Sequence, residues 1–169
     1  MSTPVFDLKP LTREGVPAAI EKANRYRLLN EPGEAESICL DVLNVDPDNQ
    51  HALVVLLLAL TDRFGGGFGV GATQVREVVA RLRDPYERAY YAGLVCERKA
   101  KAALTQGALG AAFKAHDLVR EAMVHFEAAE KIRPPGNDDA LLRWNACARI
   151  IMRNNLTPRG TDQYEPCFE

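Results

Sequence analysis

The stretch from residue 19 to residue 49 constrains the fold more than any other part of this 169-residue chain. It reads AIEKANRYRLLNEPGEAESICLDVLNVDPDN. A turn containing Asn30, Pro32 and Gly33 divides it, and Pro47 cannot continue the second half as a helix. Small and apolar residues recur at helical spacing on both sides of the turn: Ala19, Ala23 and Tyr26, then Ala35, Ile38, Cys39 and Val42. The pattern predicts two antiparallel helices, each with one face to bury.

Caps, prolines and glycines predict five more helices after this hairpin. Thr73 is expected to cap the helix that follows a glycine-rich loop at 65–71, and Asp84 with Pro85 begins the next helix. Hairpins therefore begin near residues 16, 50 and 86, and one terminal helix stands alone. The five predicted helices begin at about residues 50, 73, 85, 111 and 137.

The fold expected from these elements is all-α, with about seven helices in one domain at 16–155. Residues 1–15 contain Pro4 and Pro10 and are expected to form an irregular lead-in. The terminal helix at 137–155 is expected to cover the last apolar face of the stack. Residues 156–169 are rich in turn formers and are expected to form a flexible tail, with contact to a groove of its own or a neighbouring chain as the alternative.

The first hairpin resembles the tetratricopeptide repeat (TPR), a helical hairpin of about 34 residues that stacks on copies of itself. Five residues stand on matching positions of that family's pattern: Ala23, Tyr26, Ala35, Val42 and Pro47. The third hairpin repeats part of the pattern in longer helices, at Gly93, Ala122, Phe126, Ala129 and Pro134. The resemblance covers most of residues 16–155 and implies a right-handed stack of about three TPR-like hairpins.

In the TPR family the first helix of each hairpin lines a concave groove that holds a partner peptide or helix. The resemblance therefore implies a non-catalytic adaptor or scaffold, and it places the binding residues on the polar faces of those helices. The groove residues expected on this basis are Asn24, Arg27, Tyr91, Arg98, Lys101, Asn145 and Arg149. They form a mildly basic trough suited to an acidic or C-terminal segment, and the alternative is the ordinary solvated side of amphipathic helices.

Composition excludes several other classes of protein. Hydrophobic residues make up 47% of the chain, which is ordinary globular usage, and the net charge of −2 gives no general attraction to nucleic acid or to an anionic membrane. The longest apolar run, at 52–60, is about half of what a membrane span requires, and no secretory signal is visible. We therefore expect a cytosolic protein.

The residue types that usually carry chemistry are scattered in this sequence. The three histidines, His51, His116 and His125, have no metal-ligand spacing, and the cysteines form no CxxC pair, so neither a metal nor another cofactor is predicted. Glu97 beside Arg98 is interpreted as part of a solvated, self-compensating face. A small-molecule or enzymatic role would instead use Arg98, Lys101 and Arg149 around an anion.

A stripe of small residues runs along the predicted fifth helix at spacings of three and four. We expect this stripe to pack inside its own hairpin, with a homodimer seam as the alternative. A self-associating structural subunit is accordingly the second functional class that the sequence leaves open. The stripe consists of Ala89, Gly93, Cys96, Ala100 and Ala103.

Overall fold

The computed structural model describes residues 3–66 and 71–160, and this part of the chain is all-helical, as predicted. It contains seven α-helices and two short 3-10 turns, η1 (Arg13–Gly15) and η2 (Phe64–Gly66). The α-helices are α1 (Val16–Leu28), α2 (Pro32–Val45), α3 (Gln50–Asp62), α4 (Ala72–Ala80), α5 (Pro85–Gln106), α6 (Ala111–Lys131) and α7 (Asp139–Asn154).

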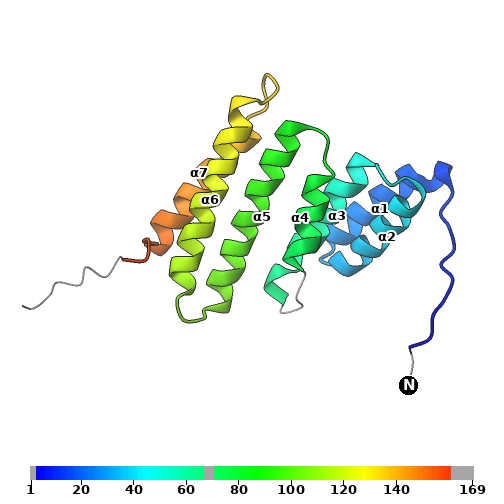
Figure 1. Cartoon of the computed structure of the whole chain (residues 1–169), viewed down its shortest axis with the longest axis horizontal. Coiled ribbons are helices and arrows are strands. Elements are labelled where there is room, and N and C mark those ends of the chain that lie inside the picture. Colours follow the sequence, from blue (N-terminus) through cyan, green and yellow to red (C-terminus); the bar gives the residue numbers. More distant parts are fainter. Residues whose placement is uncertain (1–2, 67–70, 161–169) are drawn as a thin grey trace, which may run out of the picture.

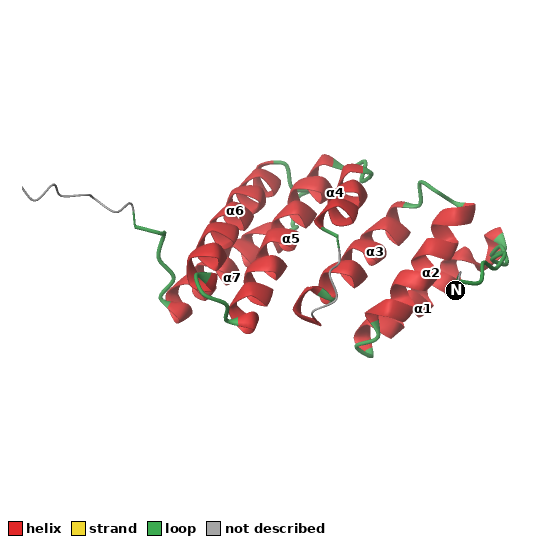
Figure 2. Cartoon of the chain, turned by 60° about the horizontal axis from the view of Figure 1, so that its bottom comes forward, coloured by secondary structure: helices red, strands yellow, loops and turns green. Residues whose placement is uncertain are grey.

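The helices stack as successive hairpins in one elongated row, from α1 and α2 at one end to α6 and α7 at the other (Figures 1 and 2). The first helix of each hairpin contacts the first helix of the next, so that α1 touches α3, α3 touches α5, and α5 touches the single helix α7. We call these four helices the inner layer. Helices α2, α4 and α6 complete the hairpins.

Two hydrophobic clusters hold the row together. The first joins α1 to α4, and α3 is buried nearly all round in it, as its run of leucines predicts. The second joins α5, α6 and α7 around Phe126, whose side chain is fully buried. Tyr91 packs against both clusters, and Val95 of α5 belongs to the first. The two clusters therefore meet along α5.

Local signals in the sequence account for several helix ends. The Asn49 side chain accepts a hydrogen bond from the Ala52 backbone N–H at 2.9 Å, and Asp84 caps Tyr86 in the same way at 2.9 Å. Pro85 is the first residue of α5, as predicted, and Gly107 ends that helix with φ of +63°. These caps fix where α3 and α5 begin, and both helices carry residues of the candidate site.

Two predicted boundaries are wrong. Gly71, whose backbone is extended at the cap position, precedes a helix that begins at Ala72, so Thr73 lies inside α4 and does not cap it. The predicted tail begins too early, because the Leu156 side chain is only 6% exposed and packs into the second cluster. Burial of this one leucine extends the ordered chain past the last helix. Parts of the predicted loop at 65–71 and of the predicted tail at 156–169, namely residues 67–70 and 161–169, lie outside the described residues.

The small-residue stripe packs inside the α5–α6 hairpin, as predicted. A Cβ atom placed on Gly93 would lie 2.8 Å from Cε1 of Phe126, so the Phe126 ring on α6 leaves no room for a side chain at this position of α5. Ala100 and Cys96 are buried in the same contact. Within the chain, most of this stripe is therefore covered by α6.

None of the helices described is at once long enough and apolar enough to cross a lipid bilayer.

Candidate binding groove

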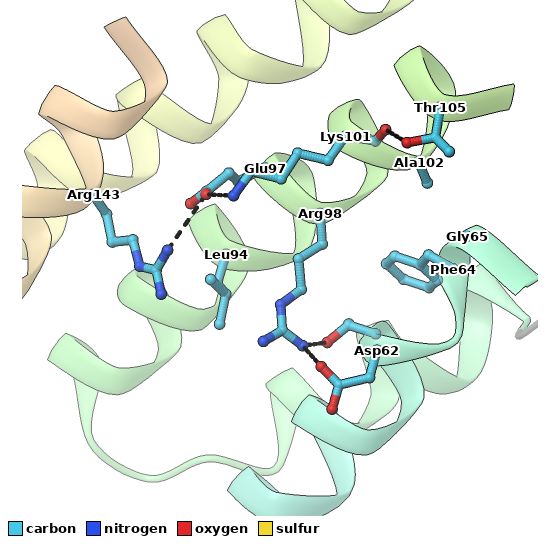
Figure 3. A pocket seen from close by; sticks show the side chains of 11 residues that line it. Asp62, Phe64, Gly65, Leu94, Glu97, Arg98, Lys101, Ala102, Thr105 and Arg143 are labelled. Carbon is cyan, nitrogen blue, oxygen red and sulfur yellow. Dashed lines mark hydrogen bonds and ion pairs between the residues drawn. The ribbon is translucent and has the colours of Figure 1, made fainter. Parts of the chain in front are cut away.

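An open hollow of about 340 Å³ lies between α3, α5 and α7 in the inner layer. Five charged side chains line it, two from acidic residues and three from basic residues (Figure 3). We call these five residues the charged hollow: Asp62, Glu97, Arg98, Lys101 and Arg143.

Arg98 is fixed against the end of α3. Its Nη1 atom donates to the Leu58 carbonyl at 3.0 Å, to Thr61 Oγ1 at 2.6 Å and to Asp62 Oδ1 at 2.6 Å. The other oxygen of Asp62 accepts from Nε of Arg27, on α1, at 2.8 Å. One carboxylate thus links cationic side chains from α1 and α5, and three helices of the inner layer share one polar network.

Glu97 is the most deeply buried charged residue of the hollow, with none of its surface exposed. Its Oε1 atom accepts from Lys101 one helical turn later, and from Nη1 of Arg143 on α7 at 3.4 Å. Figure 3 shows the two cationic side chains reaching this carboxylate from different helices. The second oxygen, Oε2, is buried and has no hydrogen-bond partner within the described structure.

Burial of Glu97 has a direct consequence for its two partners. An isolated buried carboxylate is strongly unfavourable, so the chain must keep a cation beside it. Lys101 is half exposed and Arg143 is 39% exposed, and each therefore presents its remaining N–H groups to solvent while Glu97 holds it in place. Glu97 acts as the anchor that orients these two cations around the hollow.

The hollow and its neighbourhood carry an excess of positive charge. Arg27, Arg98, Lys101 and Arg143 face the two carboxylates of Asp62 and Glu97. Burial lowers the pKa of Arg98, although the Asp62 charge opposes that shift. For Arg143, burial favours a lower pKa, but a hydrogen bond with Tyr90 and the charge of Glu97 outweigh it and raise the pKa. Both guanidinium groups stay charged at neutral pH.

The structure brings together only part of the predicted groove set. Arg98 and Lys101 line the hollow, and Arg27 is joined to them through Asp62. Tyr91 lies between the two hydrophobic clusters, where burial raises its pKa to about 12. Three predicted groove residues, Asn24, Asn145 and Arg149, stand on α1 and α7 but are not part of the hollow's lining.

Three members of the charged hollow were missed or misinterpreted from the sequence. The interpretation of Glu97 as part of a solvated face is wrong, because α5 turns this residue toward α7 and buries it. Asp62 and Arg143 were not singled out, and Arg143, not Arg149, is the α7 cation beside Lys101. The spacing of Glu97 and Lys101, four residues apart on one helix, is the one local signal of this pairing.

The cysteines of the described chain are buried and free, as small hydrophobic residues would be. Burial is the main cause that raises the pKa of Cys39 and Cys147 to about 12 and that of Cys96 to about 11. At neutral pH these thiols are protonated and therefore poor nucleophiles.

No family model matches the chain, and neither a curated protein nor a solved structure matches it. The class that the structure itself defines is an all-helical protein of stacked hairpins with a charged hollow in its inner layer.

Proposed function

We propose that this protein is a non-catalytic adaptor that holds an acidic, extended segment of a partner protein along its inner layer. The observation that carries the proposal is the set of cationic side chains gathered at the hollow. Arg98, Lys101 and Arg143 come from two helices and are each held in place by a carboxylate of the chain itself.

Such preorganisation favours binding. A long cationic side chain normally loses rotamer entropy when it grips a ligand, and here Asp62 and Glu97 have already restricted that freedom. Each guanidinium keeps further N–H donors beyond those used inside the chain, and the Lys101 ammonium also has donors to spare. Charge-assisted hydrogen bonds to carboxylates are among the stronger contacts open to such groups. An acidic segment therefore complements this surface better than a neutral or basic one.

The extent of the polar network suits an extended occupant. It reaches from Arg27 on α1 through Asp62 to Arg98, and Arg143 on α7 lies on the far side of the hollow. A ligand that follows these residues would cross all four helices of the inner layer. A chain of spaced carboxylates can do this, whereas a compact ligand would occupy only the hollow.

We further propose that the hairpins are TPR-like repeats wound in a right-handed array. Support comes from the family residues in the first and third hairpins, from hairpins beginning at Val16, Gln50 and Pro85, and from successive contacts within the inner layer. The cytosol is the compartment we propose, because the described cysteines are free thiols.

One observation favours a second candidate, a small anionic ligand. A volume of about 340 Å³ lies within the range of small-molecule sites, and Arg98, Lys101 and Arg143 converge on it. Self-association of the chain is the remaining alternative, and it makes no use of the hollow.

Selection from a random peptide-display library against the whole chain tests the adaptor proposal. We expect the selected peptides to be enriched in Asp and Glu and to bind less tightly as salt concentration rises. In fluorescence anisotropy, the Arg98→Gln, Lys101→Gln variant should bind them at least tenfold more weakly, which corresponds to one charge-assisted hydrogen bond or more.

The matched control is Arg120→Gln, Lys131→Gln, which removes the same two charge types from exposed positions on α6. This variant should bind like wild type, and circular dichroism should show all three proteins folded. Peptides without an acidic bias, or equal weakening in both variants, would rule the proposal out. If the selection yields no peptide but citrate or inorganic phosphate binds the wild-type chain, the small-ligand candidate would be favoured.

A further inference from the structure

Three metal-ligand side chains meet on the α5–α6 hairpin, apart from the charged hollow. The Sγ atom of Cys96, a carboxylate oxygen of Glu121 and a ring nitrogen of His125 all lie within 4.8 Å of one another. None of the three residues lines the hollow. Cys96 belongs to α5, and Glu121 and His125 stand one turn apart on α6.

The backbone that carries these residues is tightly fixed. Gly93, one turn before Cys96, lies against the ring of Phe126, which directly follows His125 in the sequence. The side chains of Phe126 and Ala122 are fully buried beside them, so sliding one helix along the other would break this contact. The spacing between Cys96 and the α6 pair is therefore set by core packing. Sites built on packed helices position their ligating side chains more precisely than sites built on loops.

We propose that Cys96, Glu121 and His125 form a binding site for a thiophilic divalent cation, with Zn²⁺ as the best match. Thiolate sulfur, imidazole nitrogen and carboxylate oxygen are the three kinds of ligand that Zn²⁺ takes in proteins. The sulfur disfavours Mg²⁺ and Ca²⁺, which prefer oxygen ligands. Three protein ligands leave the fourth tetrahedral position for water or for a group from another molecule.

Only small side-chain movements separate the observed geometry from coordination. Ligand atoms that share one tetrahedral Zn²⁺ lie roughly 3.3–3.6 Å apart, given metal–ligand bonds of about 2.0–2.3 Å. His125 Nε2 and Glu121 Oε1 are 3.9 Å apart, and their side chains are 37% and 58% exposed, so both can rotate. Cys96 is only 8% exposed and supplies the fixed point. When the Sγ–metal bond forms, the thiol proton passes to the buffer.

The charges around the cluster suit a cation. Glu121 supplies one negative charge directly, and the bound thiolate supplies a second, which together offset the charge of a divalent ion. Burial and the nearby Glu121 carboxylate raise the pKa of the Cys96 thiol to about 11, while the Lys99 charge opposes that shift, so the free site holds a thiol whose proton the metal must displace. The prediction of no metal site rested on the spacing of histidines and on the lack of a CxxC pair along the sequence, whereas this cluster needs the register of two packed helices.

Titration of the whole chain with Co²⁺, followed by competition with Zn²⁺, tests this site. Tetrahedral Co²⁺ bound to a thiolate gives a sulfur-to-metal charge-transfer band in the near ultraviolet together with intense visible bands. We expect both in the wild type, and we expect Zn²⁺ to abolish them at one equivalent. His125→Ala and Cys96→Ala should each weaken Co²⁺ binding by more than tenfold, since even the loss of an outer-shell partner typically costs 10–100-fold.

Control variants show whether Co²⁺ binding requires this cluster or comes from other cysteines and histidines of the chain. His116→Ala changes another histidine of α6, and Cys39→Ala changes a buried cysteine of the first cluster, so both should bind Co²⁺ like wild type. His125 is partly exposed, so its variant should keep the helical circular dichroism spectrum even if Cys96→Ala does not fold. Absence of a thiolate band in wild type, or full retention of it in folded His125→Ala, would overturn the assignment.

Discussion

Replacing Phe126 by alanine is expected to lower the free energy of unfolding by about 3–5 kcal/mol, the range for large-to-small changes of a buried Phe. The side chain is fully buried at the centre of the second cluster. Its ring lies against Gly93 and stands 5.8 Å, between centroids, from the ring of Tyr90. Truncation would remove the ring that fills the space beside Gly93, and that glycine has no side chain to occupy the void.

Urea unfolding followed by circular dichroism measures this change. Leu142→Ala is the control, because that side chain is 59% exposed, and its effect should stay within about 0.5 kcal/mol. We expect Phe126→Ala to lower the midpoint strongly, with the slope unchanged if unfolding stays two-state. A loss below about 1 kcal/mol would mean that α5 and α6 do not pack around this ring.

The second large effect concerns the buried carboxylate of the hollow. Removing both cations beside Glu97, in the double variant Lys101→Ala, Arg143→Ala, should lower the free energy of unfolding by about 3 kcal/mol. This is the lower end of the range for leaving a buried charge without a partner. We choose the lower end because both cations are partly exposed and therefore partly screened by water. Glu97 itself has no exposed surface from which to regain hydration.

A third substitution, added to the double variant, shows whether its lost stability comes from the unpaired buried charge of Glu97 or from lost side-chain packing. Adding Glu97→Met to the double variant removes the unpaired carboxylate and keeps a similar volume, so most of the lost stability should return. Thermal unfolding of the wild type, the double variant and the triple variant measures the difference. If the triple variant is no more stable than the double variant, then Glu97 is not the buried anchor of these side chains.

Local patterns in the sequence predicted the fold because the decisive features are local. Asp84 before Pro85 and Asn49 before an apolar run define helix starts without reference to the rest of the chain. The contact of Gly93 with the second helix of its hairpin follows from the spacing of small residues. Leu156 was placed in the tail because nothing in its neighbouring residues shows that it fills a gap in the second cluster.

The charged hollow could be predicted only in part, because its geometry depends on how separate helices are rotated. Arg98 and Lys101 follow from the polar face of α5, whereas burial of Glu97 depends on where α7 comes to lie. Arg143 and Arg149 stand on the same helix, and the sequence alone does not say which of them faces Glu97. The meeting of Cys96 with His125 depends in the same way on the register of two helices.

The measurement that tests the central claim most directly is amide chemical-shift mapping of the isotope-labelled chain with an acidic peptide taken from the display selection. We predict that the largest shifts fall on the inner layer, around Asp62, around Glu97 to Lys101, and around Arg143, with a second group near Arg27. Shifts confined to α2, α4 and α6, or scattered evenly over the chain, would contradict the proposal that the inner layer holds the partner.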